Sequence, residues 1–175
     1  MRDGDALENN PHISRSALEA MHDQVFSWAL SRCDFDRAAA EDLMQQAYVE
    51  LLSGNARFEK LSSLKTFVFA VVQNLARSRF RRLASRLRLV SRYAQEPPAE
   101  QMDAGVEESQ SEVWRAVHRL PPRQRDVIEL VFCRDMTVEE ASTVMGVSVG
   151  TGRVHYDRAK KTLRNNLRQM VEAPE

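Results

Sequence analysis

The chain of 175 residues has a hydrophobic share of 43%, a charged share of 29% and no net charge. This length holds one ordinary domain or two small ones, and no apolar run approaches the roughly 20 residues that span a membrane. The N-terminus lacks the basic-then-apolar pattern of a signal peptide. Cys33 and Cys133 lie far apart without metal-ligand spacing, so we expect two free thiols in a cytoplasmic protein.

The charges are distributed unevenly along the chain. Residues 57–92 carry 10 basic side chains and one acidic side chain, whereas residues 96–112 carry six acidic side chains and no basic one. A concentrated basic block in a chain without net charge indicates that this block has a polyanion as its partner.

Hydrophobic periodicity predicts helices over residues 15–32 and 37–52. Ser14 is placed to cap the first helix, and Asp34 or Asp36 to cap the second. The polar segment before the first helix is expected to fray. Because no segment shows the period-2 alternation of a strand over a useful length, we expect an all-α protein without a sheet.

The third predicted helix runs from Leu64 to about Tyr93, after a loop that contains one aromatic residue, Phe58. Apolar residues at helical spacing predict its buried face: Leu64, Phe67, Val68, Val71 and Leu75. A second face presents an amide, a hydroxyl and two guanidiniums, on Asn74, Ser78, Arg77 and Arg81. Those groups suit phosphates and base edges. A solvated surface is the more frequent explanation of an arbitrary basic helix, so this assignment depends on the rest of the chain.

Residues 94–111 differ in composition, with Pro97-Pro98, one glycine and few apolar side chains. This composition is typical of a flexible acidic linker. It divides the chain into two small helical domains, at 14–93 and 112–171. The simpler explanation of the linker's negative charge is that it keeps the protein soluble. The alternative is that the acidic linker occupies a nucleic-acid path until it is displaced.

The second domain begins with a helix near Glu112, which Pro121-Pro122 ends. The next helix is predicted over 123–132. Its expected buried residues are Val127, Ile128, Leu130 and Val131.

A helix-turn-helix pattern follows. Thr137 and Glu140 form a capping box for a short helix, and Gly146 permits a positive φ in the turn. Ser148 then caps a last helix, predicted over about 149–170.

The last helix is the predicted recognition helix, which lies in a major groove with its N-terminal half at the bases. The residues placed at base edges are Thr151, Arg153, Val154 and Asp157, and those placed at phosphates are Arg158, Lys160 and Lys161. Val154 is also available to the core. An ordinary helical hairpin with a solvated basic face is the alternative, but the two caps and the glycine turn together favour DNA.

At this point the chain resembles bacterial RNA polymerase sigma factors of the sigma-70 family, in the extracytoplasmic function (ECF) group. Residues 40–46 resemble the core-binding helix of region 2, and residues 63–76 resemble its −10 recognition helix. Residues 120–125 and 148–151 resemble region 4. The resemblance covers about 15–170, with the motifs in the family's order.

The resemblance implies a role for each matching residue. The residues that would face the β′ subunit of core polymerase are Asp42, Gln45 and Gln46. A flipped −10 base would enter a pocket formed by Phe58, Lys60, Ser62 and Ser63, while Asn74 would contact the non-template strand and Arg77 and Arg81 its phosphates. The residues that would meet the −35 element are Arg153, Val154, Asp157 and Arg158.

The resemblance also implies the partners. These are core RNA polymerase, through its β′ and β subunits, promoter DNA, and an inhibitory anti-sigma factor that can be membrane-anchored. It implies no cofactor, no metal, no small-molecule substrate and no enzymatic activity. The sequence agrees, because it contains no phosphate loop, nucleophile elbow or metal-ligand spacing.

The sequence departs from the family at three positions. Phe67 stands where the family usually has tryptophan. Gly152 lies within the recognition helix, where it costs about 1 kcal/mol relative to alanine, and we expect it to allow close backbone approach to DNA. Asp157 adds an acid to this surface, where it can accept from a cytosine N4 or pair with Lys160 or Lys161.

Two other classes of protein remain as alternatives. A stand-alone helix-turn-helix repressor explains residues 113–170 but leaves 37–82 without a purpose, and no heptad seam for a dimer is visible. A sigma mimic that titrates an anti-sigma factor usually carries a receiver domain, for which this length leaves no room.

Overall fold

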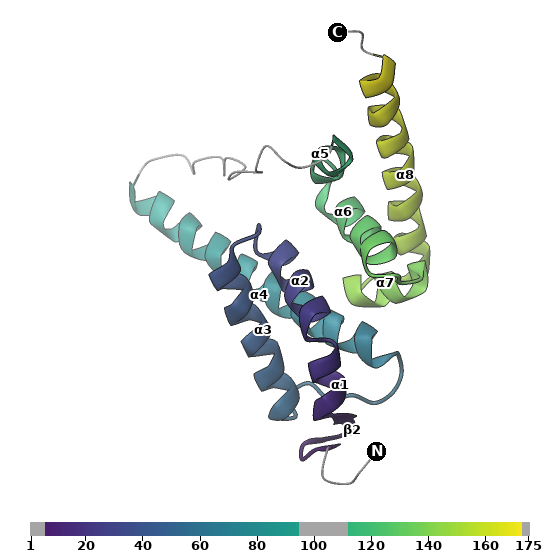
Figure 1. Ribbon diagram of the computed structural model, residues 1–175. Helices are drawn as coiled ribbons and strands as arrows, with labels where there is room; N and C mark the ends of the chain where they lie inside the picture. Colours follow the sequence, from purple (N-terminus) through teal and green to yellow (C-terminus); the bar gives the residue numbers. More distant parts are fainter. Residues whose placement is uncertain (1–5, 95–111, 173–175) are drawn as a thin grey trace. The chain divides into compact units, whose positions relative to one another are not determined.

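The computed structural model describes residues 6–94 and 112–172. Apart from one short hairpin, these residues form helices and connecting loops, which confirms the all-α class (Figure 1). The chain divides into two compact units, Met1–Ala104 (unit 1) and Gly105–Glu175 (unit 2). The linker predicted over 94–111 lies outside the described residues except for its first residue, which ends a helix.

The first predicted helix of unit 1 is divided in two. It is interrupted at Met21, where the backbone leaves the helical region (φ −101°, ψ 0°), to give α1 (Arg15–Ala20) and α2 (His22–Arg32). Ser14 caps α1 as predicted, because its hydroxyl accepts a hydrogen bond from the Ala17 N–H at 3.1 Å.

The second helix, α3 (Arg37–Leu52), has the predicted bounds. Its cap is Asp36, whose carboxylate accepts from the Ala39 N–H at 3.0 Å. One face of α3 is buried, and the residues that form it are Ala40, Leu43, Met44, Ala47 and Leu51. This face packs against α2 and α4 (Leu64–Ala94), so the three helices share one core.

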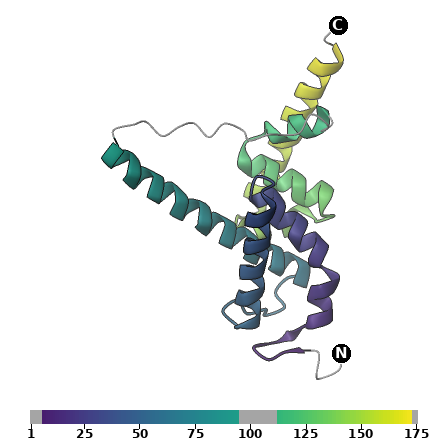
Figure 2. The ribbon, with the colours of Figure 1, turned by 60° about the vertical axis from the view of Figure 1, so that its left-hand side comes forward.

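The first half of α4 packs in this core, and its second half extends beyond α2 and α3 (Figure 2). The helix is rotated relative to the predicted face. Its buried apolar residues are Val68, Phe69 and Val72, whereas the other predicted residues, Leu64, Phe67, Val71 and Leu75, are half-buried.

Trp28 of α2 is the partner that sets this rotation. Its ring stacks on Phe69 with 5.7 Å between centroids, and its Nε1–H donates to the Phe69 carbonyl at 3.2 Å. Residues 67–72 are all apolar, so periodicity alone could not choose between adjacent faces of α4.

An antiparallel hairpin precedes α1. Its strands are β1 (Ala6–Leu7) and β2 (Asn10–Ser14), with Leu7 opposite Asn10. The expectation that no sheet forms is therefore wrong, and so is the expectation of fraying for residues 6–13, whereas residues 1–5 lie outside the described residues.

Buried contacts with the end of α3 and with the α3–α4 connection hold the hairpin. The Asn10 side-chain amide donates to the carbonyls of Leu51 and Ala56 at 2.5 and 2.9 Å. Its oxygen accepts from the Phe58 N–H at 3.0 Å, and Ile13 is fully buried. These partners lie more than 40 residues away, so the local pattern of the segment did not predict its structure.

Unit 2 consists of α5 (Glu112–His118), α6 (Pro122–Ile128), the π-helical turn η1 (Glu129–Cys133), α7 (Val138–Met145) and α8 (Val149–Glu172). The predicted break at the prolines is confirmed, with Pro122 in the first turn of α6.

The second half of the helix predicted over 123–132 is the π turn rather than an α-helix. Of the expected core residues, Val127, Ile128 and Leu130 are buried, but Val131 is half-buried. Glu129 and Arg134 form a largely buried ion pair of 3.2 Å at this turn, which no apolar pattern predicts.

Candidate nucleic-acid interface

The predicted helix-turn-helix forms in unit 2 from α7, its turn and α8. The capping box is complete, because the Glu140 N–H donates to the Thr137 hydroxyl at 3.1 Å and the Thr137 N–H donates to the Glu140 carboxylate at 2.9 Å. Gly146 has the expected positive φ of 63°. The Ser148 hydroxyl accepts from the Thr151 N–H at 3.2 Å and so caps α8.

Gly152 serves the packing of α8 on α7, which corrects the expectation that it allows close approach to DNA. The residue is buried, and a Cβ added to it would lie 1.9 Å from the Ser142 hydroxyl oxygen. That oxygen is itself held by donating to the Val138 carbonyl at 2.6 Å. The glycine is therefore required where the two helices cross.

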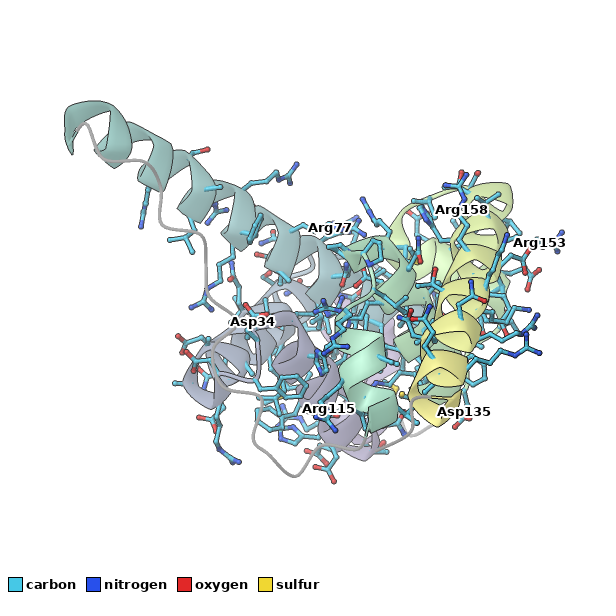
Figure 3. The ribbon with its side chains drawn as sticks, turned by 90° about the horizontal axis from the view of Figure 1, so that it is seen from above. Asp34, Arg77, Arg115, Asp135, Arg153 and Arg158 are labelled. Carbon is cyan, nitrogen blue, oxygen red and sulfur yellow. The ribbon has the colours of Figure 1, made fainter. Side chains whose placement is uncertain are left out.

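The exposed face of α8 carries the residues predicted to meet DNA. Exposed side chains on it are Thr151, Arg153, Val154, Asp157, Arg158, Lys160 and Lys161. Arg153 and Arg158 extend from α8 in Figure 3. The alternative that Val154 packs in the core is wrong, because 46% of it is exposed, and the described residues of α8 that are buried are Gly152 and Ala159.

Two ion pairs set the electrostatics of this face. Arg153 Nη2 lies 2.7 Å from the Glu139 Oε1 of α7. Lys160 Nζ lies 3.5 Å from the Asp157 Oδ1 and also over the Tyr156 ring. One of the two partners expected for Asp157 is therefore confirmed, and this pairing offsets its negative charge.

The exposed side of α4 forms a second basic surface, in unit 1. Asn74 and Arg81 are exposed, whereas Arg77 and Ser78 are half-buried. A shallow depression on the helix is lined by Ser78, Arg81, Arg82, Ser85 and Arg86. The last three of these are basic or hydroxyl side chains that continue the predicted face by one turn.

The loop before α4 has a buried part and an exposed part. Phe58 is only 9% exposed, and its ring packs on Phe67 with 5.2 Å between centroids. Lys60 and Ser63 are exposed and Ser62 is half-buried. The Ser63 hydroxyl also accepts from the Thr66 N–H at 3.1 Å, which makes it the cap of α4, a role that we did not predict. Phe58 therefore lies beneath the exposed part of the loop, where it contacts Phe67.

The residues predicted to bind core polymerase lie together on the exposed side of α3. Asp42, Gln45 and Gln46 are exposed, and Val49, one turn further on, is 59% exposed. An exposed apolar residue beside these polar groups is the signal that could have added Val49 to the predicted surface.

Both cysteines are free, and burial raises the pKa of each thiol, so they stay protonated near neutral pH. No group of three His, Cys, Asp or Glu side chains among the described residues is placed to hold a metal ion. None of the helices in residues 6–94 and 112–172 has the length and apolar character needed to cross a membrane.

Comparison with known proteins identifies related chains. The models of the families "Sigma-70 region 2" and "Sigma-70, region 4" match residues 17–87 and 110–163. RNA polymerase sigma factor CarQ of Myxococcus xanthus is 27% identical over 158 residues, which cover 87% of this chain and 88% of the relative. ECF RNA polymerase sigma factor EcfG of Rhodopseudomonas palustris is 26% identical over 128 residues, which cover 71% and 68%.

A solved structure shares the fold. It is sigma factor RpoE of Bartonella quintana in complex with the anti-sigma factor NepR, with a TM-score of 0.65 and 22% identity over 88% of this chain and 96% of that one. Two matched regions in the same order, two helical units and a set of ECF relatives agree with one another. The chain therefore belongs to the sigma-70 family of RNA polymerase sigma factors, in its extracytoplasmic function group.

Proposed function

We propose that this chain binds core RNA polymerase as a promoter-specificity subunit, directs it to a −35/−10 promoter and stabilises the open complex, without covalent chemistry of its own. The observation that carries this proposal is the presence of two different basic surfaces in one chain. The amide-bearing face of α4 lies within the region 2 match, and the exposed face of α8 lies within the region 4 match.

The −35 element would remain duplex and be read by α8. A helix fits the major groove, and residues near its N-terminus reach the base edges. Arg153 and Val154 lie in the first turns of α8, where a guanidinium suits guanine and an exposed valine suits a thymine methyl group. Arg158 and Lys161 lie further along the helix and would meet phosphates.

The −10 element would be captured as a single strand in unit 1. Such binding uses polar groups for unpaired bases, an aromatic wall and a basic track for the backbone. A pocket for one flipped base would have the Phe58–Phe67 pair as its aromatic side. Exposed Lys60 would form its polar edge. Extruding that base costs a few kcal/mol, which the contacts of the pocket must offset. Asn74 and Arg81 would hold the strand along α4.

Core polymerase would bind α3. The polar face of Asp42, Gln45 and Gln46 beside an exposed Val49 combines hydrogen-bonding groups with apolar area, as protein interfaces do. We infer that the β′ subunit covers this face and that the β subunit contacts unit 2.

An anti-sigma factor would control the chain in the cytoplasm. The Bartonella quintana relative was solved with such an inhibitor bound. We infer that an inhibitor of this class, which can be tethered to a membrane, covers surfaces within 37–82 and 137–165 and so blocks both DNA and core. A free chain that is silent with core polymerase at every promoter, and that no partner protein activates or represses, would contradict this inference.

The direct test is run-off transcription with purified core polymerase, with and without this chain, on fragments of its own genome. We expect discrete transcripts that require the chain, and alignment of their start sites would define both promoter elements. Tight duplex binding without dependence on polymerase would instead favour the repressor. Failure of both activities, together with binding to another sigma factor's inhibitor, would favour the mimic.

A further inference from the structure

Glu139 connects the first turn of α7 to the face of α8 that we assign to the −35 element. Its Oε1 lies 2.7 Å from Arg153 Nη2, across the turn and 14 residues away in sequence. Within residues 6–94 and 112–172, the Arg153 side chain makes no other hydrogen bond. Glu139 therefore contacts the side chain that the proposed function places at the bases.

Fold stability is a poor explanation for this ion pair. The two side chains are 64% and 51% exposed, and ion pairs with such exposure contribute little to folding because water and salt screen them. Glu139 is also an unfavourable choice beside DNA, since a carboxylate repels phosphates. A function for the pair in recognition accounts for its position better than stability does.

The pairing with Arg153 also favours the charged form of Glu139. The hydrogen bond and the positive charge of Arg153 lower the pKa of Glu139 below its usual value. It therefore stays charged at neutral pH. It also lies in the first turn of α7, where the helix dipole favours negative charge. The carboxylate is thus charged and paired with Arg153 in the absence of DNA.

Arginine reads guanine with two parallel N–H groups directed at O6 and N7, so its plane must be oriented correctly. A long, exposed side chain samples many rotamers, and fixing one of them beforehand reduces the cost of binding. Glu139 engages one of the two Nη2 hydrogens, so the other Nη2 hydrogen remains beside Nη1 or Nε to form a parallel pair of donors. The ion pair can therefore orient the guanidinium while leaving it able to bind a base.

We propose that Glu139 is a positioning residue for promoter recognition: it holds the Arg153 guanidinium in the orientation that reads one G·C pair of the −35 element. This inference rests on the proposed function, because it requires α8 to read duplex DNA. It adds a residue of α7 that contacts no base but determines specificity through Arg153.

The test uses holoenzyme reconstituted from core polymerase and the full chain. Promoter fragments that the wild-type holoenzyme transcribes are altered at each −35 base pair in turn, and open-complex formation is measured for each. Glu139→Gln should reduce discrimination at one G·C pair by about tenfold. Its affinity for unrelated duplex should stay the same or rise, because one negative charge is removed.

Glu140→Gln is the matched control. It removes the same charge from the neighbouring position, and glutamine still completes the capping box with Thr137. This variant should discriminate as the wild type does. Arg153→Ala should lose discrimination at the same base pair, and adding Glu139→Gln to it should cause no further loss, because the two residues act as one unit.

Three results would overturn the inference. If Glu139→Gln keeps wild-type discrimination while Arg153→Ala loses it, Arg153 reads the base without help, and the proposed function stands. If Glu139→Gln and Glu140→Gln change affinity equally at every position, the effect is general charge. If Arg153→Ala changes no −35 position although the holoenzyme transcribes, Arg153 does not read the element. Absence of any transcription would instead contradict the proposed function itself.

Discussion

At the scale of single residues, Gly152 shows what the sequence could and could not predict. Its position inside a helix marked it as unusual, because glycine there lowers helix propensity. The expected reason was DNA, and the actual reason is Ser142, which lies on the neighbouring helix. Which side chain faces a glycine depends on how two helices cross, and spacing along the chain does not contain that information.

Gly152→Ala should destabilise unit 2 despite the better helix propensity of alanine. The propensity gain is about 1 kcal/mol. The added Cβ would lie 1.9 Å from a buried oxygen that already makes a hydrogen bond, so α7 and α8 must shift. Overpacking of this kind typically costs about 1–3 kcal/mol, and a net loss of free energy of unfolding should appear in urea denaturation.

Gly150→Ala is the control, because it makes the same change two residues earlier. Gly150 is exposed, and its added Cβ would meet only the Ser148 hydroxyl, at 4.0 Å. This variant should be as stable as the wild type or more so. If both alanine variants unfold at the same denaturant concentration, the packing explanation of Gly152 is wrong.

Asn74 and Arg153 should affect different steps of initiation. Asn74 lies on the face assigned to single-stranded DNA, and Arg153 on the face assigned to duplex. Asn74→Ala should weaken open-complex formation more than binding to closed duplex. Arg153→Ala should do the reverse, with a loss of about 1–3 kcal/mol at one −35 position. Filter binding and permanganate footprinting separate the two steps, and equal loss of the same step in both variants would contradict this division.

At the scale of elements, the sequence predicted helix bounds better than helix orientation. Caps are local, so the choice of Asp34 or Asp36 and the Thr137–Glu140 box indicated where α3 and α7 begin, and the structure selects Asp36. The rotation of α4 depends on Trp28, which comes from another helix, and the hairpin depends on Asn10 bonding a distant loop. Both are tertiary effects that override a local pattern.

Because of the rotation of α4, two phenylalanines of this helix differ in burial. Phe69 is fully buried against Trp28, whereas Phe67 is half-buried against Phe58. Phe69→Ala should therefore lower the free energy of unfolding by about 3–5 kcal/mol, and Phe67→Ala by clearly less. If the face predicted from periodicity were the buried one, Phe67→Ala would cause the larger loss in free energy of unfolding. Urea denaturation of the two variants therefore distinguishes the two orientations.

At the scale of the whole molecule, composition concealed the organisation of charge. A net charge of zero is compatible with almost any soluble protein, but the basic block of 57–92 indicated a polyanion partner. In the structure, part of this block lies on the exposed side of α4, where Arg81, Arg82 and Arg86 gather. The sequence thus predicted which segment carries the surface, while Glu139 escaped notice because its partner Arg153 is distant along the chain.

Each unit builds its own core, and we expect the two to unfold separately. Val25, Trp28 and Phe69 fill the core of unit 1, and Leu130 and Met145 belong to that of unit 2. A substitution in one core should then leave the other at wild-type stability, because sites without shared partners act independently. Hydrogen exchange of backbone amides reports the local free energy of opening and can test this.

Gly152→Ala and Phe69→Ala provide a reciprocal pair for that experiment. Gly152→Ala should reduce protection in α6, α7 and α8 and leave α2, α3 and the first half of α4 unchanged. Phe69→Ala should do the opposite, because its ring packs on Trp28 in the core of unit 1. Loss of protection in both units from either substitution would mean that the units fold as one cooperative body. Separate losses would mean that the surfaces that we assign to DNA on the two units can be altered and measured one at a time.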